Sequence, residues 1–140
     1  MKTVVSIPTH RGRVLPAPLV HRFGTIWTVR GFLLLQIAIL LSTVSIHFGL
    51  LIGGYDHRAA GATELIIAAV LLAAVLLTWM PAPWSRRPAT AAQSFGIVGV
   101  LGGFLTIATG IGPRTMLDLF LNVGMLLTLT GGLAITLRKT

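Results

Sequence analysis

Four long apolar stretches, separated by short polar segments, dominate the pattern of hydrophobic and polar positions along the chain. The first stretch, residues 31–52, contains 22 residues and no formal charge. At about 1.5 Å per residue, a helix of this length covers roughly 33 Å, enough for the hydrocarbon core of a bilayer. Lipid offers no partner for free backbone N–H and C=O groups, so a segment in that core has to be helical. The other stretches predict three further spans, at about 63–80, 91–112 and 116–137.

The pattern therefore predicts an all-α fold, an integral membrane four-helix bundle over residues 31–140. Pro81 and Pro83 are expected to end the second span, and Pro113 the third, because proline cannot continue a helix. Each half of the bundle reads as a span, a short turn with an arginine, and an acid in the first turn of the next span. This shared outline allows two repeated helical hairpins.

Composition and charge placement agree with a membrane protein. Only 10% of the residues are charged, whereas soluble domains carry about a quarter. Nine Lys and Arg residues lie on one side of the predicted bundle, and only Arg58 and Arg114 lie on the other side, together with all three acids. The positive-inside rule then predicts a multi-pass protein of the inner (plasma) membrane with cytoplasmic N and C termini. The net charge of +8 is explained by this topology, and no nucleic-acid partner is expected.

Residues 1–30 are predicted to form a basic cytoplasmic arm without acids. Its segment 22–30, which contains Trp27, is a candidate interfacial helix before the first span. Two interpretations stay open, a tail retained inside by its charge and a docking arm for anionic lipid or a partner subunit. The cationic residues of this arm are Lys2, Arg11, Arg13, Arg22 and Arg30.

Small residues share one face on each of the last two predicted spans. Glycines spaced four apart, as in Gly99-x-x-x-Gly103, let two helix backbones approach closely. We expect these faces to pack the third and fourth spans together, and the alternative is contact with another membrane subunit. The residues concerned are Gly99, Gly103, Thr106 and Gly110 on the third span, and Gly124, Thr128 and Gly131 on the fourth.

Polar residues gather toward the predicted outer ends of the spans. On the first span, Gln36, Thr43 and His47 share a face, which is expected to point inward or toward a partner rather than into lipid. Residues of the two outer turns and of the following helix starts are expected to lie near His47. The predicted outer polar cluster consists of His47, Asp56, His57, Arg58, Glu64, Arg114, Asp118 and Asn122.

The first interpretation of this cluster is a structural cap that fixes the register of the hairpins. In such a cap, Arg114 is expected to pair with Asp118, and Arg58 with Glu64. The alternative is a site for a ligand, a lipid headgroup or a quinone.

Two metal-based alternatives also stay open. A metal site would use His47, His57 and carboxylates, and His47 is a weak candidate for haem ligation because a second histidine inside the spans is missing. The sequence contains no cysteine, which excludes disulfides and thiolate metal sites. No catalytic residue, metal or cofactor is predicted from these patterns.

Function is constrained mainly by what the predicted spans lack. They carry no charge at mid-depth, and no catalytic motif occurs in the sequence. The function expected first is a non-catalytic accessory subunit of a larger membrane complex, which uses the glycine-lined faces and the basic arm as contacts. The alternatives are a small oligomeric transporter or channel, lined by the polar face of the first span, and a quinone- or haem-linked membrane enzyme subunit.

Residues 45–55, with the sequence SIHFGLLIGGY, are followed by a short turn and an apolar span. This arrangement resembles uncharacterised four-span integral membrane proteins of high-GC bacteria, many of which have an Ile-His pair late in the first span and a Gly-Tyr-Arg turn. Here Asp56 stands in place of the arginine. The resemblance implies a bacterial four-span protein and brings no activity with it.

Overall fold

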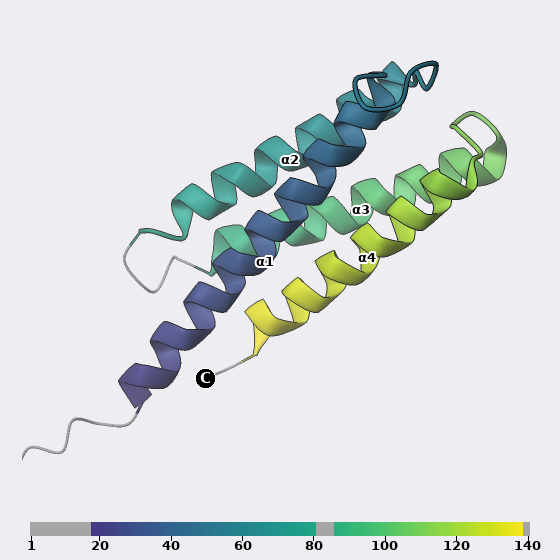
Figure 1. The fold of residues 1–140 in the computed structure, drawn as a ribbon. Helices are drawn as coiled ribbons and strands as arrows, with labels where there is room; N and C mark the ends of the chain where they lie inside the picture. Colours follow the sequence, from purple (N-terminus) through teal and green to yellow (C-terminus); the bar gives the residue numbers. More distant parts are fainter. Residues whose placement is uncertain (1–17, 81–85, 139–140) are drawn as a thin grey trace, which may run out of the picture.

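The computed structural model describes residues 18–80 and 86–138, with the backbone alone for residues 18–25. Within these residues the fold consists of four helices, α1 (Pro18–His47), α2 (Arg58–Leu77), α3 (Arg87–Thr109) and α4 (Met116–Leu137). Consecutive helices run in opposite directions, and α1 extends beyond its neighbours at its N-terminal end (Figure 1). The prediction of an all-α fold is confirmed for the described residues.

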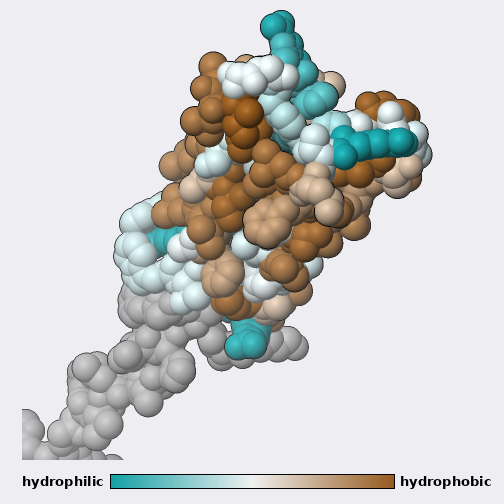
Figure 2. Space-filling view, turned by 45° about the vertical axis from the view of Figure 1, so that its right-hand side comes forward, coloured by the Kyte–Doolittle hydropathy of each residue, from teal (hydrophilic) through white to brown (hydrophobic). Residues whose placement is uncertain are grey.

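All four of these helices are long and apolar enough to cross a membrane. The qualifying segments are Ile26–His47, Arg58–Leu77, Arg87–Thr109 and Met116–Leu137. Segments of 20 to 23 residues correspond to roughly 30–35 Å of helix, close to the thickness of a hydrocarbon core. Hydrophobic residues cover most of the face seen in Figure 2, and the most hydrophilic ones lie toward the two ends of the bundle. The helices therefore indicate a multi-pass membrane protein.

The first predicted span, residues 31–52, differs from α1 at both ends. The candidate interfacial helix, residues 22–30, is continuous with α1, which begins at Pro18. At its other end α1 stops at His47, because Gly49 adopts a left-handed conformation with φ 71° and turns the chain away. Residues 48–52 are apolar but form a loop, in which Leu50 is 76% exposed. Hydropathy alone does not distinguish an apolar loop from one more turn of helix.

The other helices follow the predicted spans more closely. α4 has the predicted bounds, 116–137. α2 begins at Arg58, five residues before the predicted start at 63, because the alanines that follow are strong helix formers. α3 begins at Arg87, four residues before the predicted start at 91, since Pro88 occupies the first turn, where proline is tolerated. α3 ends before Gly110, which forms a left-handed cap with φ 80°.

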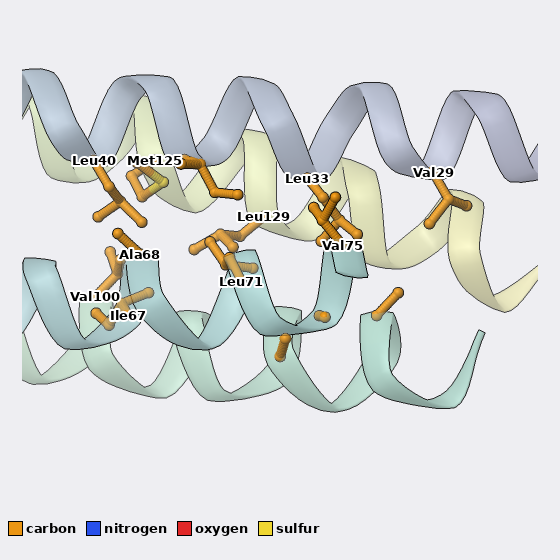
Figure 3. Close-up of a cluster of buried hydrophobic side chains, with 14 residues drawn as sticks. Val29, Leu33, Leu40, Ile67, Ala68, Leu71, Val75, Val100, Met125 and Leu129 are labelled. Carbon is orange, nitrogen blue, oxygen red and sulfur yellow. The ribbon is translucent and has the colours of Figure 1, made fainter. Parts of the chain in front are cut away.

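The hydrophobic core lies along the axis between the helices. α1 packs mainly on α2 and α4, and α3 packs on the same two helices, so α1 and α3 are diagonal neighbours. Leu33 and Leu40 of α1, Leu71 of α2 and Leu129 of α4 are among the largest fully buried side chains (Figure 3). The packing of this core determines the relative positions of the helix ends, where the polar residues lie.

The glycines of α3 contact two different helices. A Cβ atom added at Gly99 would lie 2.5 Å from Ile67 Cδ1, so Gly99 packs against α2 rather than against α4 as predicted. A Cβ atom added at Gly103 would lie 2.9 Å from Asn122 Oδ1 on α4. Gly110 lies beyond the end of α3 and does not contribute to a helix-packing face. The predicted packing of α3 on α4 therefore holds at Gly103 and is wrong at Gly99.

The small residues of α4 do not form the predicted face against α3. A Cβ atom added at Gly124 would have no atom within 4 Å, and one added at Gly131 would approach Phe32 of α1 at 3.9 Å. The hydroxyls of Thr106 and Thr128 donate to backbone carbonyls within their own helices. The predicted packing of this α4 face against α3 is therefore wrong.

Arg30, which was assigned to the docking arm, contacts the end of α2. Its Nη2 and Nε atoms donate to the backbone oxygen and the hydroxyl of Thr78, at 2.8 and 3.1 Å. The guanidinium carbon also lies 3.9 Å from the ring centroid of Trp79 and 4.8 Å from that of Trp27. Arg30 thus caps α2, since Thr78 is the residue that ends this helix. Of the other arm residues, Lys2, Arg11 and Arg13 lie outside the described residues, as does the side chain of Arg22.

Candidate functional site

His47, the last residue of α1, lies between two carboxylates. Its Nδ1 atom is 2.7 Å from Glu64 Oε2 on α2, and its Nε2 atom is 3.1 Å from Asp118 Oδ1 on α4. The side chains of His47 and Asp118 are 3% and 1% exposed, and that of Glu64 is 19% exposed. Three helices therefore meet on one imidazole ring, and we refer to Glu64, His47 and Asp118 as the His47 cluster.

The hydrogen bonds of the His47 cluster determine its net charge. An ionised carboxylate oxygen can only accept a hydrogen bond, so each of the two contacts requires one proton between the ring nitrogen and the carboxylate oxygen. An imidazole with two protons contributes +1 and two carboxylates contribute −2, giving −1 in total. The sum is the same if a proton shifts from nitrogen to oxygen within either bond. With these two protons and no others, the cluster carries one net negative charge in a nearly buried position.

Asp118 is oriented by a capping box at the start of α4. Thr115 precedes the helix in an extended conformation, and its hydroxyl oxygen accepts from the Asp118 N–H at 3.2 Å. In return, Asp118 Oδ2 accepts from the Thr115 N–H at 3.0 Å and from the Thr115 hydroxyl at 2.6 Å. This reciprocal pattern satisfies free N–H groups at the helix start. It also leaves Asp118 Oδ1 available for the hydrogen bond with His47 Nε2.

Gly61 allows Glu64 to approach the end of α1. A Cβ atom added at Gly61 would lie 3.1 Å from the Phe48 ring and 3.2 Å from His47 Cβ. Glu64 follows three residues later on the same helix face, so the close approach of α2 brings its carboxylate to the imidazole. The backbone supports this contact, because the His57 N–H donates to the His47 carbonyl at 2.8 Å.

Tyr55 covers the His47 cluster from the loop between α1 and α2. Its ring stacks on that of His47, with a centroid separation of 5.7 Å and an interplanar angle of 20°. Its hydroxyl lies 2.8 Å from the Thr115 hydroxyl. Burial, followed by the neighbouring Asp118 carboxylate, raises the pKa of Tyr55 to about 12. Sequence reasoning missed this residue, although the chain contains only one tyrosine and places it directly in the turn after His47.

The predicted pairing of Arg58 with Glu64 is wrong. Arg58 Nε lies 3.3 Å from the carboxylate of Asp56, and both side chains are exposed. A separation of six residues puts Arg58 and Glu64 on different faces of α2, because a helix turns about 100° per residue. The ring of His57 lies perpendicular to that of Tyr55, with centroids 5.0 Å apart, and its centroid is 6.3 Å from that of His47.

The predicted pairing of Arg114 with Asp118 is also wrong. Arg114 Nε donates to the carbonyl of Ile107 at 3.2 Å, near the C-terminal end of α3. The oxygens of Asp118 are already engaged by Thr115 and His47. Asn122 does lie beside the cluster, since its Nδ2 donates to the Asp118 carbonyl at 2.9 Å.

The His47 cluster forms one wall of a cavity of about 580 Å³. The exposed lining residues include Thr63 of α2 and Gly102 and Thr106 of α3, together with Ala59 and Ile111 near the loops. The cavity therefore opens between α2 and α3 at the loop end of the bundle. Its volume lies within the range of small-molecule sites, about 300–1,000 Å³. The apolar part of the lining includes Leu40, Ile67, Val100, Ile107, Leu121 and Met125.

A second polar group lies deeper in the bundle, at Gln36 and Gln93. Both side chains are fully buried, and Gln36 Nε2 donates to the Thr128 carbonyl at 2.9 Å. Gln36 Oε1 and both amide atoms of Gln93 have no hydrogen-bond partner among the described residues. The predicted inward orientation of Gln36, Thr43 and His47 agrees with their burial. Gln93 was missed, although it is the one amide in the third apolar stretch.

The metal-based alternatives find no geometric support. Among the described side chains, those of residues 26–80 and 86–138, no group of three or more His, Asp or Glu residues could hold a metal ion. Both ring nitrogens of His47 are engaged, so an iron atom would have to displace one carboxylate before it could bind the imidazole.

Comparison with known proteins assigns no family, since no family model, curated protein or solved structure matches this chain.

Proposed function

We propose that this chain is a multi-pass membrane protein that binds a small amphipathic molecule in the cavity beside the His47 cluster. The observation that carries the proposal is the position of the cluster, which forms the polar wall of an otherwise mainly apolar cavity. Ligand sites are commonly apolar cavities with a few convergent polar groups. Bringing charged groups out of water is costly even when they are paired, so a purely structural link between helices would be formed more cheaply by apolar side chains.

We further propose that both termini are cytoplasmic and that the membrane is the bacterial plasma membrane. The asymmetry of Lys and Arg and the resemblance to four-span proteins of high-GC bacteria support this arrangement. The cavity then opens toward the outer leaflet, between α2 and α3. Reporter fusions after Arg86 and after Thr140 test the topology, and we expect both reporters on the cytoplasmic side. Reporters on opposite sides would overturn it.

The accessory-subunit interpretation has less support from the described residues. Gly99 and Gly103 contact neighbouring helices of the same chain, and Arg30 binds the end of α2. A channel along the bundle axis also lacks support in this conformation. Leu40, which lies between Gln36 and His47 in the sequence of α1, and Met125 of α4 are buried apolar residues of the cavity lining (Figure 3).

Two glycine variants test the proposed binding site. Gly102 lines the cavity, and a Cβ atom added there would have no atom within 4 Å, so Gly102→Leu fills the mouth without displacing a neighbour. Gly124→Leu is the matched control, because Gly124 has the same free space and lies outside the cavity lining. The wild type and both variants are purified from the native host in mild detergent and analysed by mass spectrometry.

We expect a small molecule to accompany the wild type and Gly124→Leu and to be lost from Gly102→Leu. An empty wild-type protein, or a molecule that Gly102→Leu retains in full, would overturn the proposed function.

A further inference from the structure

We propose that the ligand of this cavity is an amphipathic organic cation, with one ammonium group on an apolar body. This inference rests on the proposed function and names the chemical class of its ligand. It follows from the hydrogen-bonding capacity that remains in the lining, from the charge of the His47 cluster and from the apolar remainder of the cavity.

The polar lining offers mainly acceptors. Three threonine hydroxyls of the cavity, those of Thr43, Thr63 and Thr106, donate to carbonyls of their own helices, so their oxygens present lone pairs. Glu64 uses Oε2 for His47, and its Oε1 has no hydrogen-bond partner in the described part of the chain. Asn122 donates through Nδ2 to the backbone, which leaves Oδ1 directed at Gly103 in the cavity wall. A ligand that donates hydrogen bonds matches this lining.

The charge of the lining favours the same class of ligand. The His47 cluster carries a net charge of −1, and one ammonium group would neutralise it. Arg58 also lines the cavity, but its side chain is exposed and pairs with Asp56. Arg114 lies outside the lining and binds the carbonyl of Ile107. His57 lines the cavity at the mouth, where its ring contacts Tyr55. A cation is therefore attracted by the cluster, and an anionic headgroup is repelled by it.

A quinone matches the lining less well. Its carbonyl oxygens accept hydrogen bonds, and here they would face the oxygens of Glu64, Asn122 and Thr106. The two ring nitrogens that could donate to a quinone are already engaged by carboxylates. Unpaired acceptors that face each other in an apolar site lose the free energy of their hydrogen bonds to water.

Three probes separate these classes on the full chain in phosphatidylcholine nanodiscs. The first is 1-naphthylmethylamine, an ammonium ion near neutral pH, and the second is its neutral isostere 1-naphthylmethanol. The third is a short-chain ubiquinone. Each is titrated by isothermal calorimetry into the wild type, Glu64→Gln and Gly124→Leu. Gly124→Leu changes no charge, lies outside the cavity lining and serves as the control.

We expect the wild type and Gly124→Leu to bind the amine about tenfold more tightly than the alcohol, a difference of about 1.4 kcal/mol. Glu64→Gln is expected to lose this preference while still binding both naphthyl probes. Helicity by circular dichroism shows that this variant is folded, and Gly102→Leu, which leaves the cluster intact, is expected to lose both probes.

The possible failures are distinguishable. Equal affinity of the wild type for amine and alcohol, or preferential binding of the ubiquinone, overturns the assignment of a cation while the cavity remains a binding site. If none of the three probes binds the wild type, the ligand class and the proposed function both fail.

Discussion

The Nε2 atom of His47 lies 3.1 Å from Asp118 Oδ1, which joins the last residue of α1 to the capping box of α4. The opposite ring nitrogen is bonded to Glu64 of α2. One imidazole therefore connects the α1–α2 hairpin to the α3–α4 hairpin and at the same time forms part of a cavity wall. The following predictions separate its contribution to stability from its contribution to binding.

Replacing His47 with alanine leaves Glu64 and Asp118 without a shared partner. We expect the free energy of unfolding to fall by about 3–5 kcal/mol, the usual cost of breaking a buried ionic contact by removing one partner. Reversible unfolding in mixed micelles measures this loss. His57→Ala is the control, because His57 contacts the Tyr55 ring edge, and its loss is expected to cost about 1 kcal/mol or less. Similar losses for the two variants would contradict the role of the cluster.

Thr115 is expected to tolerate serine and not alanine. Thr115→Ala removes the hydroxyl that caps α4 and that contacts Tyr55 and Asp118, so stability is expected to fall by about 1–2 kcal/mol. Thr115→Ser keeps the hydroxyl and is expected to stay within about 0.5 kcal/mol of the wild type. The same unfolding assay measures both variants. A serine variant as unstable as the alanine variant would show that the methyl group, rather than the cap, matters.

We expect the phenol of Tyr55 to lose its proton only at high pH. It is the only tyrosine in the chain, so the ultraviolet absorbance of tyrosinate reports this residue alone. We expect a pKa of about 12 in the folded protein, raised by burial and by Asp118. Asp118→Asn is expected to lower this value without restoring it fully, because burial is the larger cause. An ordinary pKa in the wild type would show that Tyr55 does not cover the cluster.

The raised pKa of Tyr55 also determines whether the stability of the fold rises or falls with pH. The folded chain holds the phenolic proton more tightly than the unfolded chain, whose tyrosine has its usual pKa of about 10. The corresponding stabilisation is fully present below about pH 10 and is lost as the pH rises toward about 12. Tyr55→Phe cannot lose this proton and is expected to lose less stability over that interval than the wild type.

Two glycines of α4 are expected to respond oppositely to alanine. A Cβ atom at Gly132 would lie 2.6 Å from Gln36 Nε2, so Gly132→Ala has to displace the amide that binds the Thr128 carbonyl. We expect a loss of about 1–3 kcal/mol, typical of a buried polar group left without its partner. Gly124→Ala has free space and is expected to gain up to about 1 kcal/mol from its higher helix propensity. Unfolding free energies with the same sign for both variants would contradict this packing.

Helix ends could be predicted from the sequence where a proline or a capping residue marks them. The start of α4 follows from Pro113 before the helix and from Asp118 in its first turn, which the structure shows in a capping box with Thr115. The end of α1 could not be predicted in the same way, because residues 48–52 are as apolar as the helix that precedes them. Only the left-handed backbone at Gly49 reveals the loop.

Three residues of the site, His47, Glu64 and Asp118, were predictable from the sequence, whereas Tyr55 and the pairing of the acids were not. Their positions near the outer ends of the predicted spans bring His47, Glu64 and Asp118 to the same end of the bundle, but the sequence favours the nearest arginines as partners of the acids. The actual partner of both carboxylates is the imidazole, because α2 approaches α1 closely at Gly61, a contact between helices that no local pattern reveals. The cavity could not be predicted for the same reason, since its lining depends on how the helices pack against one another.

Reversible closure of the cavity mouth tests the central claim most directly. Because the chain contains no cysteine, Thr63→Cys introduces a single thiol at an exposed position of the cavity lining. Thr130→Cys is the matched control, an exposed threonine of α4 with the same hydrogen bond to its own helix and outside the lining. Each thiol is modified with a bulky disulfide reagent and later released by reduction.

The measurement is the binding of 1-naphthylmethylamine and 1-naphthylmethanol before modification, after it and after reduction. We expect at least one probe to bind, to be lost when Thr63→Cys is modified and to return on reduction, with Thr130→Cys unaffected throughout. Binding that persists after modification at residue 63, or the absence of binding by both probes at the start, would contradict a ligand site beside His47.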